Sequence, residues 1–478
     1  MEKLGTIDST ILVIFLFLSV LIGYVAAKRT KSSADFAVAN RSLGTFITMA
    51  TLAASMVGAF AVIAQAGFAY KNGISAYWFV VSWCAGWAVL AVISKRLRDT
   101  DALTLPDVFR KRFGDKAAAL GGVITLIFVI GTLSSQLAAT GLVLQILLAP
   151  YGVDFVTATI IGAILVAVYT IFGGLYAVVY NDAFHFITLF VGICIITPIV
   201  TGNTVPADFS FSGSFPAEMW DWSNGTTTMA IAGLFVSFMF TATSNPMLIQ
   251  RTLAARTSRI ASNAHWYSIC WYLVVGLVVT LCAMAGRFIL PGLENPEMYM
   301  PIFILTYMPV VFKGILIAAL LSVLMSTIDS QLLVAGTTTS IDLFKTIRPN
   351  ADDKSVLLVS RGSIIFWSII GMLLALYFKS VLGLFAYATK IYGAAMFFPL
   401  LYTLYANKGY STAMFAGMIS GAVCSLTWAI SGNPYGISPV IFGGTVSIVA
   451  TLAGHLYGTK QASLNDTFDS QVSTEITS

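Results

Sequence analysis

The stretch GILIAALLSVLMSTIDSQLLVAGTTTSIDLF, residues 314–344, decides the fold of this chain. It begins as an apolar helix of the length that crosses a membrane. Polar residues then fall in the middle of the predicted span, namely Ser326, Thr327, Asp329 and Ser330. Val323 stands at i, Ser326 and Thr327 at i+3 and i+4, and Ser330 at i+7, so these four share one helix face.

The chemistry of this face indicates an ion site. Hydroxyl and carboxylate oxygens are hard ligands, which suit alkali and alkaline-earth cations better than soft metals. An ionisable residue at membrane depth, such as Asp329, marks an ion or substrate path by default. The alternative is that the hydroxyls only bond back to their own helix or join two helices. The clustering of three hydroxyls with a carboxylate favours the ion site.

Composition places the chain in a membrane. Of its 478 residues, 58% are hydrophobic and 10% are charged, whereas soluble proteins carry about 25% charged residues. The five cysteines lie in apolar segments without CxxC spacing, so they imply neither a disulfide framework nor a metal site. The three histidines are scattered, so no catalytic cluster is indicated and no enzyme is predicted. The net charge of +5 belongs to loops on one side of the membrane and indicates no nucleic-acid partner.

Apolar stretches of about the 20 residues that a membrane helix needs recur along the whole chain. They predict an all-α polytopic protein with about thirteen spans, near 7–27, 45–70, 75–94, 117–149, 155–177, 181–201, 227–250, 264–290, 313–342, 357–377, 381–405, 411–430 and 436–458. The first is interpreted as a retained helix and not as a removed signal peptide. The segment 117–149 is too long for an upright span, so it tilts or extends into the interface.

Basic residues predict the orientation. They gather after the first, third, seventh and ninth spans: Lys28, Arg29, Lys31, Arg41, Lys95, Arg96, Arg98, Arg110, Lys111, Arg112, Lys116, Arg251, Arg256, Arg259, Lys345, Arg348, Lys354 and Arg361. The intervening loops have fewer basic residues, and the loop 202–226 is acidic. The positive-inside rule then places the N-terminus outside and the C-terminus in the cytoplasm, in a plasma membrane or bacterial inner membrane.

Two spans are poor continuous helices. Residues 51–60, TLAASMVGAF, are small and polar at their centre, and residues 241–251, TATSNPMLIQR, contain Pro246, which cannot donate to the helix. These are the first spans of two five-span blocks. Interrupted spans at matching places in two halves indicate an inverted-repeat transporter with a site at the membrane midplane. The alternative is that Pro246 only kinks its helix.

The predicted organisation follows from these blocks. It comprises an extra N-terminal helix with a cytoplasmic lead-in at 1–44, a first repeat at 45–201, an extracellular loop at 202–226, a second repeat at 227–405, accessory helices at 406–460 and a disordered polar tail at 461–478.

With these residues assembled, the chain resembles the sodium:solute symporter family over nearly its whole length. The matching pieces occur in the family's order: DFAVANRSLG at 35–44, GFAYKNGIS at 67–75, YTIFGGLYAVVYNDAFHF at 169–186, NPMLIQRTLAAR at 245–256 and VLMSTIDSQLLVAGTTTSIDLF at 323–344. The last is the most specific and is close to the proline and pantothenate members. The resemblance implies a leucine-transporter-like fold of two five-helix inverted repeats, with sodium as the coupling ion.

The resemblance also implies two ion sites. The family's common sodium site corresponds to backbone carbonyls at Ala54, Val57 and Val323 and to the hydroxyls of Ser326 and Thr327. A second sodium site, present in some members, corresponds to the acid Asp182 and to positions 326, 329 and 330, where Asp329 here replaces a hydroxyl beside Ser330. This departure leaves three interpretations open: a more tightly bound second cation, a proton, or a gate formed by the acids with a basic residue.

The implied solute site is less specific. Its candidate residues are Gly58, Phe60, Gln136, Phe238, Asn245 and Lys390. Phe238 and Ala242 stand where the proline symporter has tryptophan and tyrosine, which argues against proline, and Pro246 replaces a glutamine of the sugar members, which argues against sugars. Lys390 lies deep in a core span, where it pairs with an anionic, carboxylate-bearing solute or with an acid, or reaches out to the surface.

We therefore expect a sodium-coupled symporter that imports a small organic solute across a lipid bilayer by alternating access. A proton-coupled symporter of the same fold and an uncoupled facilitator or channel are the alternatives. The chain carries no ATP-binding motif, so an ion gradient supplies the energy.

Overall fold

The computed structural model describes residues 4–210, 213–378 and 381–476, and these residues form helices and loops without a β-strand. The α-helices are α1 (Thr6–Ala27), α2 (Ser33–Val38), α3 (Thr45–Met56), α4 (Gln65–Asn72), α5 (Tyr77–Arg98), α6 (Leu105–Phe113), α7 (Asp115–Leu148), α8 (Phe155–Leu189), α9 (Thr197–Thr204), α10 (Thr228–Thr243), α11 (Pro246–Ala254), α12 (Ser258–Ile289), α13 (Tyr299–Tyr307), α14 (Phe312–Thr337), α15 (Lys345–Ile347), α16 (Asp353–Tyr377), α17 (Val381–Tyr405), α18 (Ser411–Ile430) and α19 (Pro439–Ile476). The all-helical class predicted from composition is confirmed.

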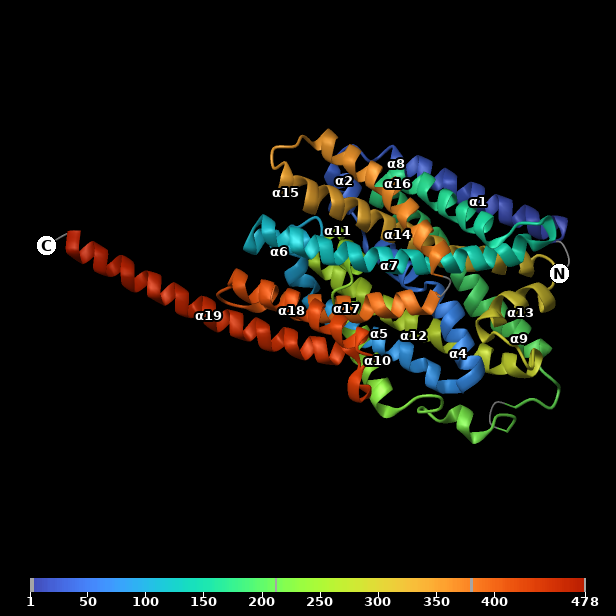
Figure 1. Cartoon of the computed structure of the whole chain (residues 1–478). Coiled ribbons are helices and arrows are strands. Elements are labelled where there is room, and N and C mark those ends of the chain that lie inside the picture. Colours follow the sequence, from blue (N-terminus) through green and yellow to red (C-terminus); the bar gives the residue numbers. More distant parts are fainter. Residues whose placement is uncertain (1–3, 211–212, 379–380, 477–478) are drawn as a thin grey trace.

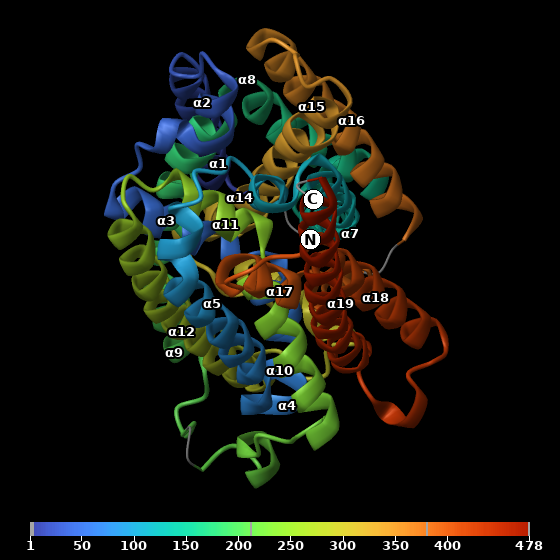
Figure 2. The same ribbon diagram turned by 90° about the vertical axis from the view of Figure 1, so that its left-hand side faces the viewer.

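Helix α14, which contains residues 314–337 of the stretch that decides the fold, is the most enclosed span. Within its most apolar window 94% of the residues are buried, against 22% for α1 at the periphery. It packs against α1, α3, α7, α8, α11 and α16. The end-on view in Figure 2 shows α14 and α11 surrounded by the other helices. An almost wholly buried helix needs apolar residues on all sides, and α14 has them except at its hydroxyls, Lys313, Asp329 and Gln331.

The predicted count of about thirteen spans is not confirmed. In the described part of the chain, ten helical stretches are long and apolar enough to cross a membrane. Some predicted spans run together: 155–177 and 181–201 both fall in the stretch Phe155–Thr204. Within it, the two parts of α8 meet at Gly174, whose φ of +53° suits glycine, and an added Cβ would lie 2.6 Å from the ring of Phe36.

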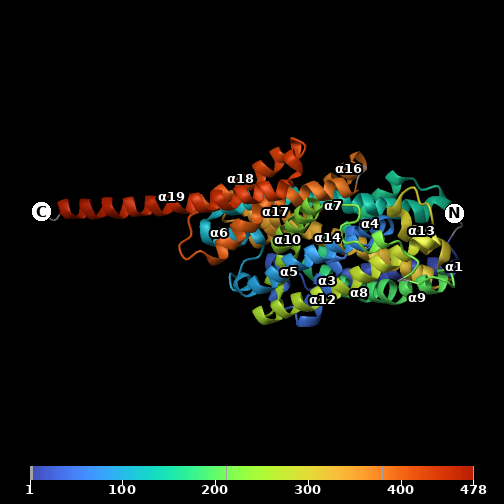
Figure 3. The same cartoon turned by 90° about the horizontal axis from the view of Figure 1, so that it is seen from below.

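The long segment predicted at 117–149 is a single helix. Helix α7 has 34 residues, so it is about 50 Å long at about 1.5 Å per residue, well beyond the hydrocarbon thickness. The tail, predicted to be disordered from residue 461, instead continues α19 as a helix to Ile476. Figures 1 and 3 show this end of α19 projecting away from the bundle. Extending an existing helix avoids the cost of nucleation, which explains the difference.

Candidate functional site

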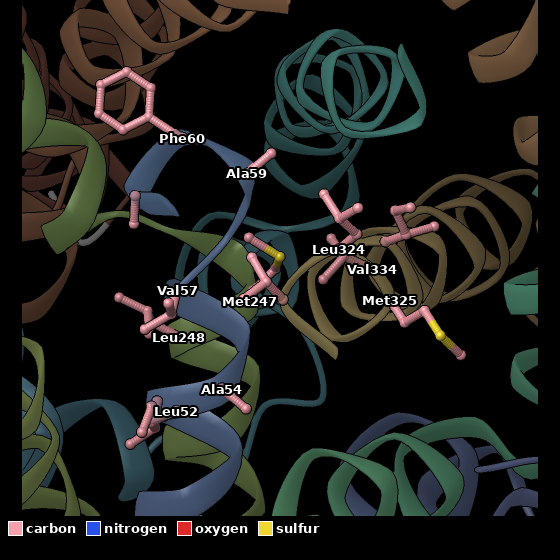
Figure 4. Packing of buried hydrophobic residues seen from close by; sticks show 14 of the residues in the cluster. Leu52, Ala54, Val57, Ala59, Phe60, Met247, Leu248, Leu324, Met325 and Val334 are labelled. Carbon is pink, nitrogen blue, oxygen red and sulfur yellow. The ribbon is translucent and has the colours of Figure 1, made fainter. Parts of the chain in front are cut away.

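Helix α3 breaks where the sequence predicted a poor helix. It ends at Met56, and Val57 takes a non-helical ψ of 74° before the chain resumes as a π-helical segment at Phe60–Ala64. Figure 4 shows the chain leaving the helical path between Val57 and Ala59. The side chain of Gln136 on α7 supports the break, because its Oε1 accepts the Ala59 N–H at 3.1 Å.

Gly58 allows other elements to approach this break closely. A Cβ at this position would lie 2.8 Å from Gln136 Nε2 and 3.0 Å from Thr327 Oγ1. Gly58 therefore brings the backbone of α3 into contact with both α7 and α14, and a side chain would push at least one of them away.

The second break lies between α10 and α11. Asn245 caps α11, with its Oδ1 accepting from the N–H groups of Met247 at 2.9 Å and Leu248 at 3.3 Å, and Pro246 follows at the first helical position. On the α10 side, the Ser244 carbonyl accepts the Tyr392 hydroxyl from α17 at 2.8 Å. The backbone groups freed by this break thus have protein partners.

The hydroxyls of α14 meet the first break. Ser326 donates to the Ala54 carbonyl at 3.0 Å, and Thr327 donates to the Ser55 carbonyl at 3.2 Å. Both also lie within hydrogen-bond distance of the Val323 carbonyl. The structure thus brings Ala54, Val323, Ser326 and Thr327 together, and it adds the carbonyl of Ser55 to this group. Val57 follows directly after the last residue of α3, and its place in the sodium site stays a prediction. Two hydroxyls and three carbonyls are hard oxygen donors that fit sodium.

One acid of the predicted second site, Asp182, has a basic partner, whereas the other, Asp329, is held by hydroxyls. Asp182 on α8 forms an ion pair with Arg251, 3.3 Å between Oδ2 and Nη2, and both side chains are fully buried. The Ser330 hydroxyl accepts from Arg251 Nη2 at 2.5 Å. Asp329 accepts from the Tyr169 hydroxyl at 2.9 Å and from Ser330 at 3.2 Å. The prediction that Arg251 belongs to a cytoplasmic loop is wrong, because α11 carries its side chain into the protein core.

A cavity with about 430 Å³ of empty space adjoins both breaks. It is lined by Ser55, Met56, Gly58, Phe60, Ala61, Trp83, Phe128, Thr132, Gln136, Asn245, Met247, Tyr272, Thr327, Gln331 and Phe385. None of these lining residues is charged. Four predicted solute residues, Gly58, Phe60, Gln136 and Asn245, are among them. The buried side chain of Gln331 adds an Oε1 that has no hydrogen-bond partner among the described atoms.

The other two predicted solute residues lie in a second cavity. This cavity has about 990 Å³ of empty space and includes Phe238 and Lys390 in its wall. Phe60 and Phe385 line both cavities, with their rings stacked at a centroid distance of 5.0 Å. Phe238 meets Phe60 edge to face at 5.5 Å. These aromatic rings separate the central cavity from Lys390.

Sequence reasoning missed several residues of the site. They are Thr51, Ser55, Trp83, Arg251 and Gln331. Ser55 and Thr51 lie in the small polar segment that predicted the break, and Gln331 follows directly after Ser330, so proximity in sequence was an available signal. Arg251 stands six residues after Asn245 in an otherwise apolar run, which indicates a buried helix turn.

Comparison with known proteins identifies relatives along nearly the whole chain. The family model described as the sodium:solute symporter family matches residues 36–421. The high-affinity proline transporter PutP of Bacillus subtilis is 30% identical over 453 residues, covering 90% of this chain and 94% of that protein. The sodium/proline symporter of Escherichia coli is 28% identical and covers 91% of each chain.

Solved structures share the fold. A Na⁺-coupled sialic acid symporter superposes with a TM-score of 0.80 at 18% identity, covering 95% of this chain and 98% of that one. Mhp1, a nucleobase-cation-symport-1 family transporter, superposes with a TM-score of 0.58 at 15% identity, covering 90% and 96%. The leucine-transporter-like fold expected from the sequence is confirmed by these superpositions.

Proposed function

We propose where this chain binds its ion and its solute, starting from the family to which it belongs. The chain is a member of the sodium:solute symporter family. It is a sodium-coupled membrane transporter of a small organic solute and not an enzyme. Sodium binds between the end of α3 and α14, held by the carbonyls of Ala54, Val57 and Val323 and the hydroxyls of Ser326 and Thr327. The observation that carries this proposal is that both α14 hydroxyls reach α3 carbonyls directly beside its break.

The solute binds in the central cavity next to this ion. Thr327 supports the link between them, because its hydroxyl belongs to the proposed sodium site and its side chain lines the cavity. An ion that joins α3 to α14 would also order the cavity wall at Gly58. Sodium and solute should therefore tighten each other's binding by the same factor, which is the requirement for coupled transport.

We infer that the solute is a small zwitterion or neutral molecule with a compact apolar body, the class that contains proline. The cavity offers amides from Gln136, Gln331 and Asn245 in a wall that also holds several aromatic rings and no charged lining residue. An ion pair with the solute at this depth would need a charged partner in the wall. The relatives named as proline transporters support this class.

Lys390 and Phe238 then belong to an entrance and not to the central site. We propose that the second cavity is the extracellular vestibule, that the N-terminus is outside and that the C-terminus is cytoplasmic. The alternation of basic loops supports this orientation. This orientation requires the two termini to lie on opposite sides of the membrane, and in Figure 1 they lie at opposite ends of the bundle.

A thermal-shift experiment on the purified full chain tests the proposal. The panel contains proline, other small neutral amino acids, monocarboxylates and sugars, each in sodium or potassium chloride at equal ionic strength. We expect stabilisation by a small zwitterion in sodium only, by about 2.7 kcal/mol at 100 times its Kd. Stabilisation by an anionic solute or a sugar alone would refute the solute class. Equal stabilisation in potassium would refute the sodium site.

Two variants separate the cavities. Gln136→Ala should weaken the solute effect by at least about tenfold in concentration, since it removes an amide from the cavity wall and the support of the Ala59 N–H. Lys390→Ala is the matched control in the vestibule, where the solute effect should change less than about threefold because the lost charge does not contact the bound solute. The reverse order of effects would place the solute at Lys390.

A further inference from the structure

The guanidinium of Arg251 fills a polar chamber at the centre of the bundle. It is fully buried and donates from Nε to Thr51 Oγ1 at 3.2 Å and from Nη2 to Ser55 Oγ at 3.1 Å. Nη2 also contacts the Asp182 carboxylate at 3.3 Å and the Ser330 hydroxyl at 2.5 Å. A single side chain from α11 thus connects α3, α8 and α14.

The groups around this guanidinium form a hard oxygen shell of their own. Thr51 donates to Asp182 Oδ2, Ser55 donates to the same oxygen at 3.1 Å, and Ser55 and Ser330 lie 3.0 Å apart. One carboxylate and three hydroxyls are the ligand types that alkali cations prefer. Asp182 Oδ1 has no hydrogen-bond partner among the described atoms, so the carboxylate keeps a further acceptor.

We propose that Arg251 is a tethered cation that occupies the place of a second sodium ion in this shell. The inference rests on the proposed sodium site at Ser326 and Thr327, and it adds that this site is the only one that sodium fills in the wild-type chain. Of the three interpretations left open for Asp182, Asp329 and Ser330, it is nearest to the third, in which the acids form a gate with a basic residue, but it gives that residue the position of the second cation.

The buried carboxylate of Asp182 is balanced by the guanidinium of Arg251. Asp182 is fully buried at membrane depth, where an unpaired carboxylate is costly, so a cation must accompany it. Arg251 supplies that cation permanently, because its side chain cannot dissociate and its guanidinium stays protonated. Among the described residues, Asp329 forms no ion pair or hydrogen bond with Arg251 and accepts hydrogen bonds instead from Tyr169 and Ser330. The guanidinium therefore balances the charge of Asp182 without an ion from solution.

The consequence for transport is a lower ion count. A cation that belongs to the chain returns with it in every cycle and transfers no charge from one side to the other. Transport should therefore be coupled to one sodium ion per solute. Replacing Arg251 by a neutral residue should leave Asp182, Thr51, Ser55 and Ser330 to bind a second sodium.

Equilibrium binding of ²²Na⁺ to the purified full-length protein tests this count. We expect one ion per chain for the wild type and two for Arg251→Gln, whose amide removes the charge but keeps a polar side chain. A wild type that binds two ions, or an Arg251→Gln variant that binds one, would overturn the proposal. If Arg251→Gln folds only in sodium chloride and not in potassium chloride, that dependence also supports it; equal failure in both salts contradicts it.

Two further variants act as controls. Arg251→Lys keeps the positive charge and should bind one ion, whereas two ions would show that charge is not what excludes sodium. The double variant Arg251→Gln with Asp182→Asn removes both charges and should return the count to one; a count of two would refute Asp182 as the ligand.

Ser326→Ala in the wild-type background separates this proposal from the one on which it rests. It should reduce the count from one to zero. If Ser326→Ala still binds one sodium ion, the proposed site at Ser326 is wrong. If Arg251→Gln also binds only one sodium ion, the tethered cation is wrong as well. If Arg251→Gln raises the count in either background, the tethered cation stands independently.

Discussion

The two broken helices of this transporter satisfy their backbone groups in different ways. At the α10–α11 break, Asn245 caps the new helix and Tyr392 bonds the freed Ser244 carbonyl. At the α3 break, the carbonyls of Ala54 and Ser55 meet hydroxyls of α14, which are themselves good cation ligands. At the α10–α11 break the protein itself supplies the hydrogen-bond partners. At the α3 break the carbonyls and hydroxyls are oxygen ligands that can also bind a cation. An interrupted helix therefore does not by itself identify an ion site. The side chains that contact the freed backbone carbonyls identify it.

The largest effect should come from removing both hydroxyls at the α3 break. The double variant Ser326→Ala with Thr327→Ala should weaken sodium binding by at least about a hundredfold, since each bond to a charged group contributes about 1.5–3 kcal/mol. Sodium titration of thermal stability at constant ionic strength measures the change. An unchanged midpoint would mean that sodium does not bind at this break.

A smaller effect should follow from Gly58→Ala. The added Cβ would lie 2.8 Å from Gln136 Nε2 and 3.0 Å from Thr327 Oγ1, and overpacking costs about 1–3 kcal/mol. We expect both sodium and solute affinity to fall by about tenfold or more, because Thr327 and Gln136 serve the two proposed sites. Gly44→Ala, with no neighbour within 4 Å of the added Cβ, is the matched control. A loss of solute affinity alone would separate Gly58 from the ion site.

At the α10–α11 break, Asn245→Ala should lower the free energy of unfolding without loss of sodium affinity. It leaves the N–H groups of Met247 and Leu248 without their cap, a loss of about 1 kcal/mol. The melting temperature in the absence of solute should fall, while the sodium midpoint stays within about twofold. Since Asn245 also lines the cavity, solute binding should weaken. A large shift in the sodium midpoint would show that this break, too, contributes to the ion site.

The smallest effect should come from Tyr392→Phe. This change removes the hydroxyl that donates to the Ser244 carbonyl at 2.8 Å and should cost about 0.5–1.5 kcal/mol. Thermal unfolding without solute measures the loss, and sodium titration should remain as in the wild type. A sodium midpoint that moves together with the melting temperature would contradict the contrast between the two breaks.

Much of the architecture was predictable from local patterns. The spacing of Val323, Ser326, Thr327 and Ser330 placed them on one helix face, and α14 brings the first hydroxyls of that face to α3. Pro246 predicted an interruption because proline lacks an N–H, and α11 starts at that residue. Apolar periodicity could not locate Gly174, because the residues on both sides of that joint are equally apolar.

The sequence by itself determined the membrane class, the polar face of α14 and the positions of both helix breaks, since these depend on hydrophobicity, helical period and proline chemistry within a short segment. Only the tertiary structure decided which groups those elements meet. Arg251 is separated from Asp182 by 69 positions, and its burial depends on α11 packing against α3 and α14. The charge of Asp182 is thus paired by a contact between distant segments, and such a pairing is a property of the folded bundle.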